Sequence, residues 1–422
     1  MQKVHNLIIG GGLSGLTLAH FLKKDYLILE KDDSLGGYCR TIKNKDYVWD
    51  YAGHFYHFQT KEFKNFFESL VPSKEIIYQN KHTKIYFKNQ LINYPFQKNI
   101  HELDKEDFID CLYDLFFREK KATHKNFLDM LYGNFGKSIA EKFLKPYNEK
   151  LYATDLRQLD EDAMGRFFPY ADFASIVGNM KRTNNISYND KFLYLKKGTG
   201  YFIDKLAETL EQKNIKTNCA VSFIDVKNKF VIVGDDKIYY NNLINTIPFN
   251  NFLQILGSNE DIQKEMSYNK VLVLNLGFDQ SSPNYQKEHW IYFPEKKINF
   301  YRVGFYNNIL GTEKLSLYVE TGFSKDQEIN IEEQLGLTME GLKEVGIISD
   351  SLKLIDKSVI IMDPAYVHIE SETNERIKKL FGDLEKDNIH TLGRYGRWAY
   401  SSMEDCMTWA KDLALTLKSK RE

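Results

Sequence analysis

Residues 4–41 read VHNLIIGGGLSGLTLAHFLKKDYLILEKDDSLGGYCRT, and this stretch decides the fold. The short apolar run at 4–9 predicts a buried strand, and the spacing of apolar residues at 13–24 predicts a helix. A second apolar run at 26–30 predicts another strand. This strand–helix–strand order is the βαβ unit of parallel sheets, so we expect an α/β fold with a Rossmann-type domain.

Three glycines occupy the turn between the first expected strand and the helix. Gly10, Gly12 and Gly15 form the pattern G-x-G-x-x-G. The first glycine permits the turn, the second lets the backbone approach a pyrophosphate, and the third lets the helix pack on the strand. Glu30 ends the second strand, where a carboxylate would hold ribose hydroxyls. Glycines alone also fit a tight structural turn, but with Glu30 in register they favour dinucleotide binding.

Two further stretches follow at once, Leu35–Thr41 (LGGYCRT) and Asp50–His54 (DYAGH). They resemble the GG-x-x-R/S and D-x-G-x-H motifs of the FAD-dependent amine oxidase and protoporphyrinogen oxidase superfamily. The resemblance implies FAD as cofactor and His54 near the flavin ring, although a buried or surface histidine of no function also fits that position. It further implies that the cofactor is contacted by Gly37, Arg40 and Gly53.

The segment Tyr94-Pro95-Phe96-Gln97 resembles the Y-P-F-Q run of the UDP-galactopyranose mutases, one branch of that superfamily. In that family the segment holds the nucleotide base. Tyr94 and Phe96 offer stacking faces, and Gln97 can donate to and accept from a uracil edge. A strand end followed by a proline turn is the alternative interpretation.

Several later stretches resemble the same family. They are Tyr147–Tyr152 (YNEKLY), Gly165-Arg166, His289–Glu295 (HWIYFPE) and Phe300–Arg302 (FYR). The resemblance places Arg166 and Arg302 on the substrate diphosphate, which suits the bidentate geometry of arginine and phosphate. Surface ion pairs are the alternative for both arginines. The same resemblance assigns to the substrate Asn148, Trp290 and Tyr292.

The last matching stretches are Ala365-Tyr366 and Gly393–Tyr400 (GRYGRWAY). The resemblance implies that Tyr366 and Tyr400 reach the diphosphate, and that Gly393 and Arg394 let the final strand-to-helix turn approach FAD. An ordinary strand aromatic is the alternative for Tyr366. The chain departs from the family at Ala52, where Gly is frequent, and at 403–405, where Met-Glu-Asp replaces Asn-Gln-Asp.

Composition excludes several classes of protein. The chain has 422 residues and a formal net charge of −1, so it lacks the positive field of nucleic-acid binding. Four dispersed cysteines without a CxxC pair predict no metal site and no disulfide scaffold, and they fit a reducing cytoplasm. No stretch approaches the roughly 18 apolar residues of a membrane span. We therefore expect a cytoplasmic protein that binds neither metal nor nucleic acid.

Strand and helix signals of nucleotide-binding type occur at both ends of the chain, with other material between them. This arrangement predicts interleaved domains rather than consecutive ones. We expect a Rossmann-type FAD-binding domain from 1–60, 190–255 and 386–422, a helical substrate-side domain from 100–189, and an antiparallel β-sheet substrate domain from 61–99 and 256–385.

The resemblance implies a nucleotide-sugar pyranose–furanose mutase, acting on UDP-galactopyranose or a related UDP- or dTDP-sugar in cell-surface polysaccharide biosynthesis. It implies covalent catalysis through an adduct between the sugar and N5 of reduced FAD, with Arg166, Arg302 and His54 as the catalytic residues. A reductant such as NAD(P)H would have to bind in the substrate cleft. The motifs near the N-terminus fit equally an FAD-dependent amine oxidase or desaturase, and the departure at 403–405 leaves a catalytically idle flavoprotein open. The sugar, the nucleotide and the oligomeric state stay open as well.

Overall fold

The computed structural model describes residues 2–44, 46–119, 122–181 and 190–420. Of the expected domains, residues 1, 45 and 421–422 of the Rossmann-type domain and residues 120–121 and 182–189 of the helical domain lie outside the described residues.

The first of two large sheets carries the glycine turn. Its strands are β1 (Gln2–Ile9), β2 (Tyr26–Leu29), β9 (Ile215–Lys216), β10 (Val221–Asp225), β11 (Phe230–Val233), β12 (Asp236–Asn245) and β18 (Ile389–Thr391). They lie in the order β10-β11-β12-β1-β2-β9, and β18 also pairs with β12. The pairs that involve β1, β2, β9 and β18 are all parallel, whereas β10 and β11 form an antiparallel edge. The predicted βαβ unit is therefore present, with α1 (Leu13–Leu22) between its strands.

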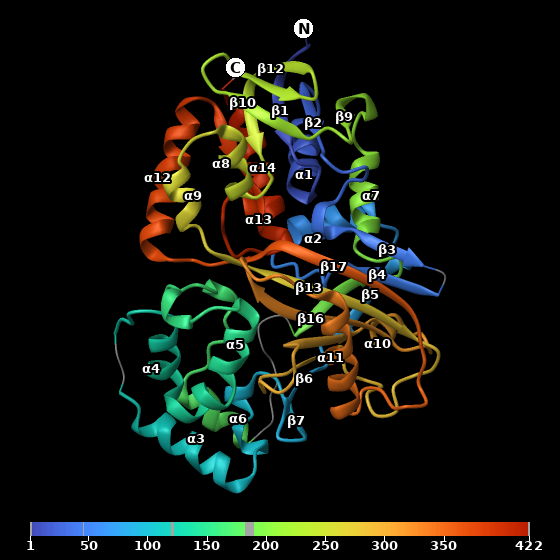
Figure 1. Ribbon diagram of the computed structural model, residues 1–422, viewed down its shortest axis with the longest axis vertical. Coiled ribbons are helices and arrows are strands. Elements are labelled where there is room, and N and C mark those ends of the chain that lie inside the picture. The colour runs from blue at the N-terminus through green and yellow to red at the C-terminus, as the bar shows by residue number, and fades with distance from the viewer. Residues whose placement is uncertain (1, 45, 120–121, 182–189, 421–422) are drawn as a thin grey trace.

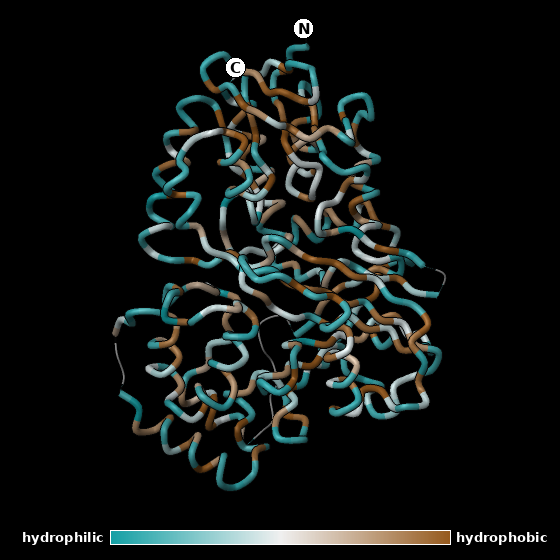
Figure 2. The backbone as a smooth tube through the Cα atoms, viewed as in Figure 1, coloured by the Kyte–Doolittle hydropathy of each residue, from teal (hydrophilic) through white to brown (hydrophobic). Residues whose placement is uncertain are grey.

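Helices cover both faces of this sheet. Successive side chains of each strand point to opposite sides, and here the side chains on both sides are apolar and pack against helices. Ile8 and Ile28 face a core shared with α1, α2 (Lys61–Leu70), α7 (Gly200–Glu208) and α14 (Met403–Ser419). Leu7 and Leu29 face a second core shared with α8 (Phe249–Leu256), α9 (Glu260–Glu265) and α12 (Ser371–Lys386). Burial on both sides explains why β2 (YLIL) and the end of β1 (LII) read as continuous apolar runs; apolar residues are brown in Figure 2.

The second sheet has seven strands in the order β17-β13-β16-β15-β14-β6-β7. Their bounds are β6 (Thr83–Phe87), β7 (Gln90–Asn93), β13 (Tyr268–Phe278), β14 (Trp290–Tyr292), β15 (Arg302–Phe305), β16 (Ser316–Ser324) and β17 (Leu354–Val367). All neighbours are antiparallel except β14 and β6. One face packs against α11 (Ile331–Glu344), and the other faces the helical part of the molecule. Two antiparallel ribbons, β3 (Thr41–Asn44) with β4 (Tyr47–Asp50) and β5 (Ile76–Asn80) with β8 (Lys191–Leu195), lie between the two sheets (Figure 1).

Four helices form the helical part at the lower left of Figure 1: α3 (Lys105–Phe117), α4 (Phe127–Ile139), α5 (Lys145–Tyr152) and α6 (Phe173–Lys181). Side-chain caps fix where two of them begin, because Asp104 accepts from the Asp107 N–H at α3 and Asn126 accepts from the Asp129 N–H at α4. A short π-helical turn at Ala140–Leu144 joins α4 to α5. The remaining short helices are α10 (Tyr306–Leu310) and α13 (Gly393–Gly396).

The predicted fold class is confirmed: a Rossmann-type sheet, a helical part and a mostly antiparallel sheet are all present. Three helices lie differently from the expected domain boundaries. The ranges 61–99 and 256–385 were expected to belong to the antiparallel sheet, yet α2, α9 and α12 pack into the cores of the first sheet. Their apolar residues predict a helix with one buried side but do not say which sheet will cover it.

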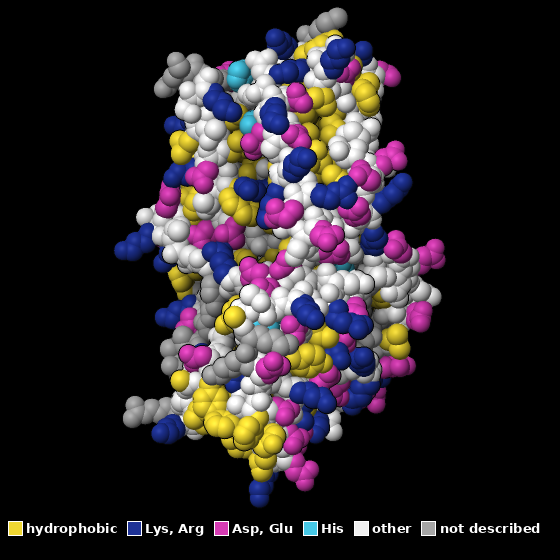
Figure 3. Space-filling model, turned by 90° about the vertical axis from the view of Figure 1, so that its left-hand side faces the viewer, with side chains coloured by type: hydrophobic (Ala, Val, Ile, Leu, Met, Phe, Trp, Pro, Cys, Tyr) yellow, Lys and Arg dark blue, Asp and Glu magenta, His cyan; other side chains and the backbone are white. Residues whose placement is uncertain are grey.

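The outer face of α3 is apolar, and hydrophobic side chains gather there at the lower end of Figure 3. Ile109, Tyr113, Phe116 and Phe117 are each more than half exposed, at a spacing that puts them on one side of the helix. Figure 3 thus shows a hydrophobic surface on the helical part, remote from the first sheet.

Candidate functional site

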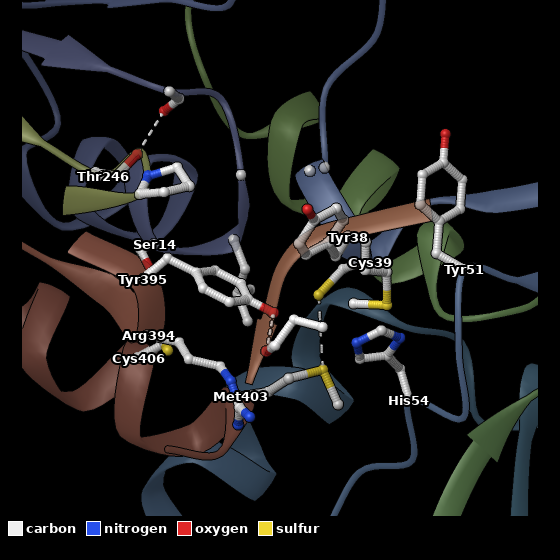
Figure 4. A pocket seen from close by; sticks show the side chains of 18 of the residues that line it. Ser14, Tyr38, Cys39, Tyr51, His54, Thr246, Arg394, Tyr395, Met403 and Cys406 are labelled. Atoms are coloured by element: carbon white, nitrogen blue, oxygen red, sulfur yellow. Dashed lines mark hydrogen bonds between the residues drawn. The ribbon is translucent and has the colours of Figure 1, made fainter. Parts of the chain in front are cut away.

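A cavity of about 720 Å³ lies where the first sheet, the second sheet and the helical part meet. The ends of the parallel strands open into it: Gly10 follows β1, Glu30 follows β2 and Thr246 follows β12. Ligands of open parallel sheets bind at this edge, outside the carboxyl ends of the strands. Figure 4 shows Arg394 and His54 approaching the cavity on opposite sides of Met403, so residues from both ends of the chain build its wall.

Each of the three glycines of the first turn contributes to the structure in a different way. Gly10 has a φ of +106°, and a Cβ on it would lie 2.3 Å from Thr246 Oγ1. A Cβ on Gly15 would lie 2.2 Å from the Gly10 carbonyl oxygen, so Gly15 allows the helix to pack on the turn. Gly12 has no other atom within 4 Å of its Cβ position and opens onto the cavity. Helix α1 begins directly after Gly12, and the backbone N–H groups at a helix N-terminus favour a bound phosphate.

Glu30 is 6% exposed and lines the cavity. Its Oε2 accepts from the Gly11 N–H at 2.6 Å, and its Oε1 accepts from the Asp32 N–H at 3.0 Å. A carboxylate oxygen has two lone pairs, so each oxygen keeps an acceptor position for a hydroxyl of a ligand.

The second glycine pair folds against the first turn. The Gly36 N–H donates to the Gly11 carbonyl at 2.9 Å, and a Cβ on Gly37 would lie 3.6 Å from the Gly12 Cα. Arg40 reaches back over this loop, donating from Nη1 to Asp32 Oδ2 at 2.8 Å and from Nε to a backbone carbonyl. Gly37 and Arg40 both line the cavity.

His54 lies on the loop after β4, with its Nδ1 3.2 Å from the Ala52 carbonyl. Burial lowers the pKa of His54 to about 4, so its ring is neutral at pH 7. Asp50 anchors the start of this loop, since it accepts from the Thr199 N–H at 3.0 Å and the Tyr194 hydroxyl at 2.8 Å. Burial raises the pKa of Asp50 to about 6. The sequence motif contained Asp50, but nothing in the sequence indicated these partners.

Arg302 and the buried carboxylate of Glu320 form an ion pair on the cavity wall. Arg302 Nε donates to Glu320 Oε2 at 2.9 Å, and Nη2 donates to Oε1 at 2.6 Å. Burial alone would lower the pKa of Arg302, but the adjacent carboxylate outweighs it and raises that pKa above its ordinary value.

A second guanidinium lies in a tyrosine cage. The rings of Tyr366 and Tyr400 stack with centroids 5.9 Å apart at 18°. The Arg394 guanidinium carbon lies 4.5 Å from the Tyr400 centroid and 5.5 Å from that of Tyr366. Arg394 also donates from Nη1 to the Ser401 carbonyl at 2.7 Å. All three predicted residues line the cavity, whereas Gly393 lies behind them against Ser14.

Arg166 lies at the rim of the cavity, but its guanidinium is hydrogen-bonded to other side chains. Nη2 lies 2.7 Å from both carboxylate oxygens of Asp405, and Nη1 donates to Gln59 Oε1 at 2.9 Å. Its neighbour Phe167 lines the cavity, whereas Arg166 is outside that lining.

The predicted base-binding segment is separate from this cavity. Phe96 is fully buried and stacks on Phe143 at 5.1 Å and 16°, so in this structure both its faces belong to the core. Gln97 is also fully buried and donates to the Pro169 carbonyl. Asn148 donates to the Leu144 carbonyl at 2.6 Å. The Gln97 and Asn148 carbonyl oxygens accept no hydrogen bond from any described residue.

The other predicted substrate residues gather beside that segment. Tyr94 and Tyr292 have ring centroids 5.3 Å apart, and the Trp290 Nε1–H donates to the Tyr292 hydroxyl at 3.0 Å. The structure therefore brings the predicted residues together in two groups, one around the cavity and one between the helical part and β14.

Three acidic residues at the site were not predicted to be site residues, although two of them, at 404 and 405, belong to the stretch that departs from the family. The third is Glu320, and its signal is the one charged side chain in strand β16, since a buried charge requires a partner. Glu404 accepts from the Gln59 and Thr60 N–H groups at 2.7 and 2.9 Å, so it joins α14 to the start of α2. Asp405 forms the capping box of α14 and also holds Arg166.

Comparisons with known proteins agree with this fold. The NAD(P)-binding Rossmann-like domain family matches residues 8–70. Coproporphyrinogen III oxidase from Staphylococcus aureus (strain NCTC 8325 / PS 47) is 24% identical over 314 residues, which cover 65% of this chain and 67% of that protein.

Among solved structures, reduced UDP-galactopyranose mutase has a TM-score of 0.92 at 23% identity, covering 99% of this chain and 96% of that chain. A proposed protoporphyrinogen oxidase from Exiguobacterium sp. 255-15 has a TM-score of 0.78 at 14% identity, covering 99% of both chains. A putrescine oxidase variant has a TM-score of 0.66 at 12% identity, again covering 99% of both. The chain thus has a UDP-galactopyranose mutase-like fold along its whole length.

Within the described part of the chain, no helix has the length and apolar character needed to cross a membrane. The same residues contain no cluster of three or more His, Cys, Asp or Glu side chains that could hold a metal ion.

Proposed function

We propose that this chain, with its mutase-like fold, is an FAD-dependent nucleotide-sugar pyranose–furanose mutase. The observation that carries the proposal is the composition of one cavity wall. The Arg302 guanidinium, oriented by Glu320, and two stacked tyrosines, Tyr366 and Tyr400, share a cavity with the glycine turn of the expected dinucleotide site. Guanidinium and tyrosine donors next to a cofactor site suit a substrate that carries a diphosphate.

The residues of the first sheet fit a flavin dinucleotide. Gly12 gives the backbone an open approach at the N-terminus of α1, and Glu30 keeps acceptor positions free for a ribose. Gly37 and Arg40 extend that surface, and Gly53 and Arg394 approach from the far side of the cavity. Reduced FAD, if bound by these residues, would supply the electron density that the anomeric carbon needs.

The chain's own residues would hold the leaving group. When the anomeric C–O bond breaks, its electron pair passes to a diphosphate oxygen, and the same bond re-forms after the ring has changed size. Arg302 with Tyr366 and Tyr400 would stabilise that charge, and Arg166 would join them if it left Asp405. His54 is neutral at pH 7, so we assign it a role in shaping the flavin side of the cavity rather than in carrying charge.

The cavity is a poor match for a cationic amine. Such a substrate would meet Arg302 and Arg394, and the nearby Glu320 carboxylate is already bonded to Arg302. An FAD-dependent oxidase of another substrate is the second candidate, favoured by the sequence similarity to coproporphyrinogen III oxidase.

One assay separates these candidates. The purified protein is incubated without oxygen, with dithionite and in turn UDP-galactopyranose, other UDP-hexoses and dTDP-hexoses, and the nucleotide sugars are separated by chromatography. We expect a furanose product from at least one of them, and none when dithionite is omitted. If no nucleotide sugar is converted, while an amine or coproporphyrinogen III bleaches the oxidised flavin, the proposal is wrong and the oxidase is correct.

A further inference from the structure

Arg302 and Glu320 are directly opposite residues on neighbouring antiparallel strands. Arg302 begins β15, Glu320 lies within β16, and the two Cα atoms are register partners. The backbone continues the pairing, because the Tyr301 N–H donates to the Glu320 carbonyl at 3.0 Å. The position of the carboxylate is therefore fixed by the sheet rather than by a mobile loop.

The two members of the pair differ in exposure. The Arg302 side chain is 19% exposed and that of Glu320 is 1% exposed. Glu320 engages the Nε and Nη2 side of the guanidinium, and Nη1 has no acceptor among the described residues. Arg302 can therefore keep this bond to Glu320 and still present one N–H edge to a ligand in the cavity.

Packing on both sides restricts the pair further. Tyr318, two residues before Glu320 on the same face of β16, is fully buried, and its ring centroid lies 5.8 Å from the Arg302 guanidinium carbon. Opposite Tyr318 stands Gly304, where a Cβ would lie 1.9 Å from the ring. The guanidinium thus has a carboxylate at one edge, an aromatic ring beside it and the cavity in front.

The carboxylate also changes what Arg302 offers a ligand. A buried guanidinium without a counter-ion would attract a diphosphate strongly, because charges interact more strongly away from water. Glu320 cancels most of that charge at short range. In the reaction proposed above, the diphosphate must leave the sugar and return to it, so excess affinity for the detached diphosphate slows the return.

We propose that Glu320 is a positioning residue that orients Arg302 and weakens its hold on the substrate diphosphate, so that the leaving group is bound reversibly. This inference rests on the proposed function. Asp405 cannot replace Glu320 in this role, because its pair with Arg166 is 23% and 43% exposed and lies at the rim.

The test replaces Glu320 by Gln, which keeps the shape and one acceptor but removes the charge. Titration calorimetry with UDP is run on the FAD-loaded protein, and steady-state turnover is measured with the nucleotide sugar that the wild type converts. For Glu320→Gln we expect about tenfold tighter UDP binding together with a lower KM and about tenfold lower kcat. Flavin absorbance reports whether FAD is retained. The matched control is Glu332→Gln, at an 82% exposed carboxylate on α11, which should change none of these three quantities.

Glu320→Asp keeps the charge and provides a second variant if the Gln variant does not fold. We expect its UDP affinity to stay within about threefold of the wild type, while a tenfold tighter binding would contradict the charge argument. Unchanged or weaker UDP binding by folded Glu320→Gln overturns the inference and leaves the proposed function standing. Failure of the wild type to bind UDP or dTDP, with no sugar converted, removes the proposed function itself.

Discussion

The arginine side chains around the cavity differ in how many of their N–H donors already bond to other residues of the protein. Arg302 has one edge committed to Glu320, whereas both sides of the Arg166 fork are committed to Asp405 and Gln59. The two predicted diphosphate arginines therefore differ in how many N–H donors are free for a ligand, and changing the donors of each should have a different effect.

Arg302→Lys keeps the charge beside Glu320 but loses the planar fork. We expect turnover to fall by a factor of about 100, the usual loss when one donor to a developing charge is removed. FAD content, read from flavin absorbance, should stay at the wild-type level because Arg302 lies beyond the glycine turns. Turnover within a factor of two of wild type would remove Arg302 from the proposed site. Lysine is preferable to alanine here, because alanine would leave the Glu320 charge buried without a partner.

Asp405→Asn releases Arg166 from its carboxylate. Because this ion pair is partly exposed, it is worth at most about 1 kcal/mol, which limits the change in affinity to about fivefold. We expect KM for the nucleotide sugar to fall by a factor of two to five, with the greatest change at low salt. Asn at 405 can still accept from the Ser402 N–H in the capping box of α14, so the unfolding midpoint serves as the control for fold. A higher KM would mean that Asp405 supports Arg166 rather than competing for it.

Two strands of the second sheet determine where the cavity wall stands. β15 and β16 approach each other at Gly304 and Tyr318 so closely that a Cβ at Gly304 would overlap the ring. Gly304→Ala should cost about 1–3 kcal/mol in the free energy of unfolding, measured by urea denaturation, because the buried ring must move. Displacing Tyr318 should also move Arg302, so we expect lower turnover.

Gly336→Ala on α11 is the matched control for that substitution. Nothing lies within 4 Å of the Gly336 Cβ position, and alanine favours a helix. Its free energy of unfolding should be unchanged or up to about 1 kcal/mol higher. Equal stability of the Gly304→Ala and Gly336→Ala proteins would show that Tyr318 has room to move.

At the scale of elements, local sequence patterns predicted the helices and strands that contacts between neighbouring residues determine. The run Val4–Ile9, its glycines and the next strand predict β1, α1 and β2, because strand burial and the glycine turn are encoded within a few residues. The sheet that α2 and α12 cover depends on long-range contacts that leave no local pattern. The burial of Phe96 in the core escaped prediction for the same reason, since an aromatic residue reads identically on a binding surface and inside a core.

The acidic residues show where reasoning from motifs stops. The family resemblance predicts Arg166 and Arg302 as ligands for a diphosphate, but their partners Asp405 and Glu320 lie in other elements. A lone carboxylate inside a strand without other charges, such as Glu320 in β16, signals that a cation is near it in the fold. The sequence does not say which cation.

For the molecule as a whole, buried histidines govern how stability varies with pH. Burial lowers the pKa of His54, His57, His289 and His368 to about 4 in each case. Between pH 6.5 and 4 the unfolded chain binds protons that the native protein excludes, so stability falls as pH falls. Asp50 acts in the opposite sense, because its raised pKa lets the native protein take up a proton near pH 6.

Four groups outweigh one, so the free energy of unfolding should decrease from pH 7 to pH 5. Each histidine contributes at most about 1.4 kcal/mol per pH unit in that window. Urea denaturation of the FAD-loaded protein at half-unit steps measures this decrease. A protein as stable at pH 5 as at pH 7 would show that these histidines take up protons in the folded state.

The cavity joins the loops after β1 and β2 to the turn between β18 and α14, which are among the first and the last described elements to be synthesised. A ribosome therefore releases the glycine turn long before the residues around Arg394 exist. A nascent chain that has reached only the first sheet's glycine turn therefore carries one half of the proposed flavin site. The two halves can meet around a dinucleotide only after the segment with Arg394 has been made.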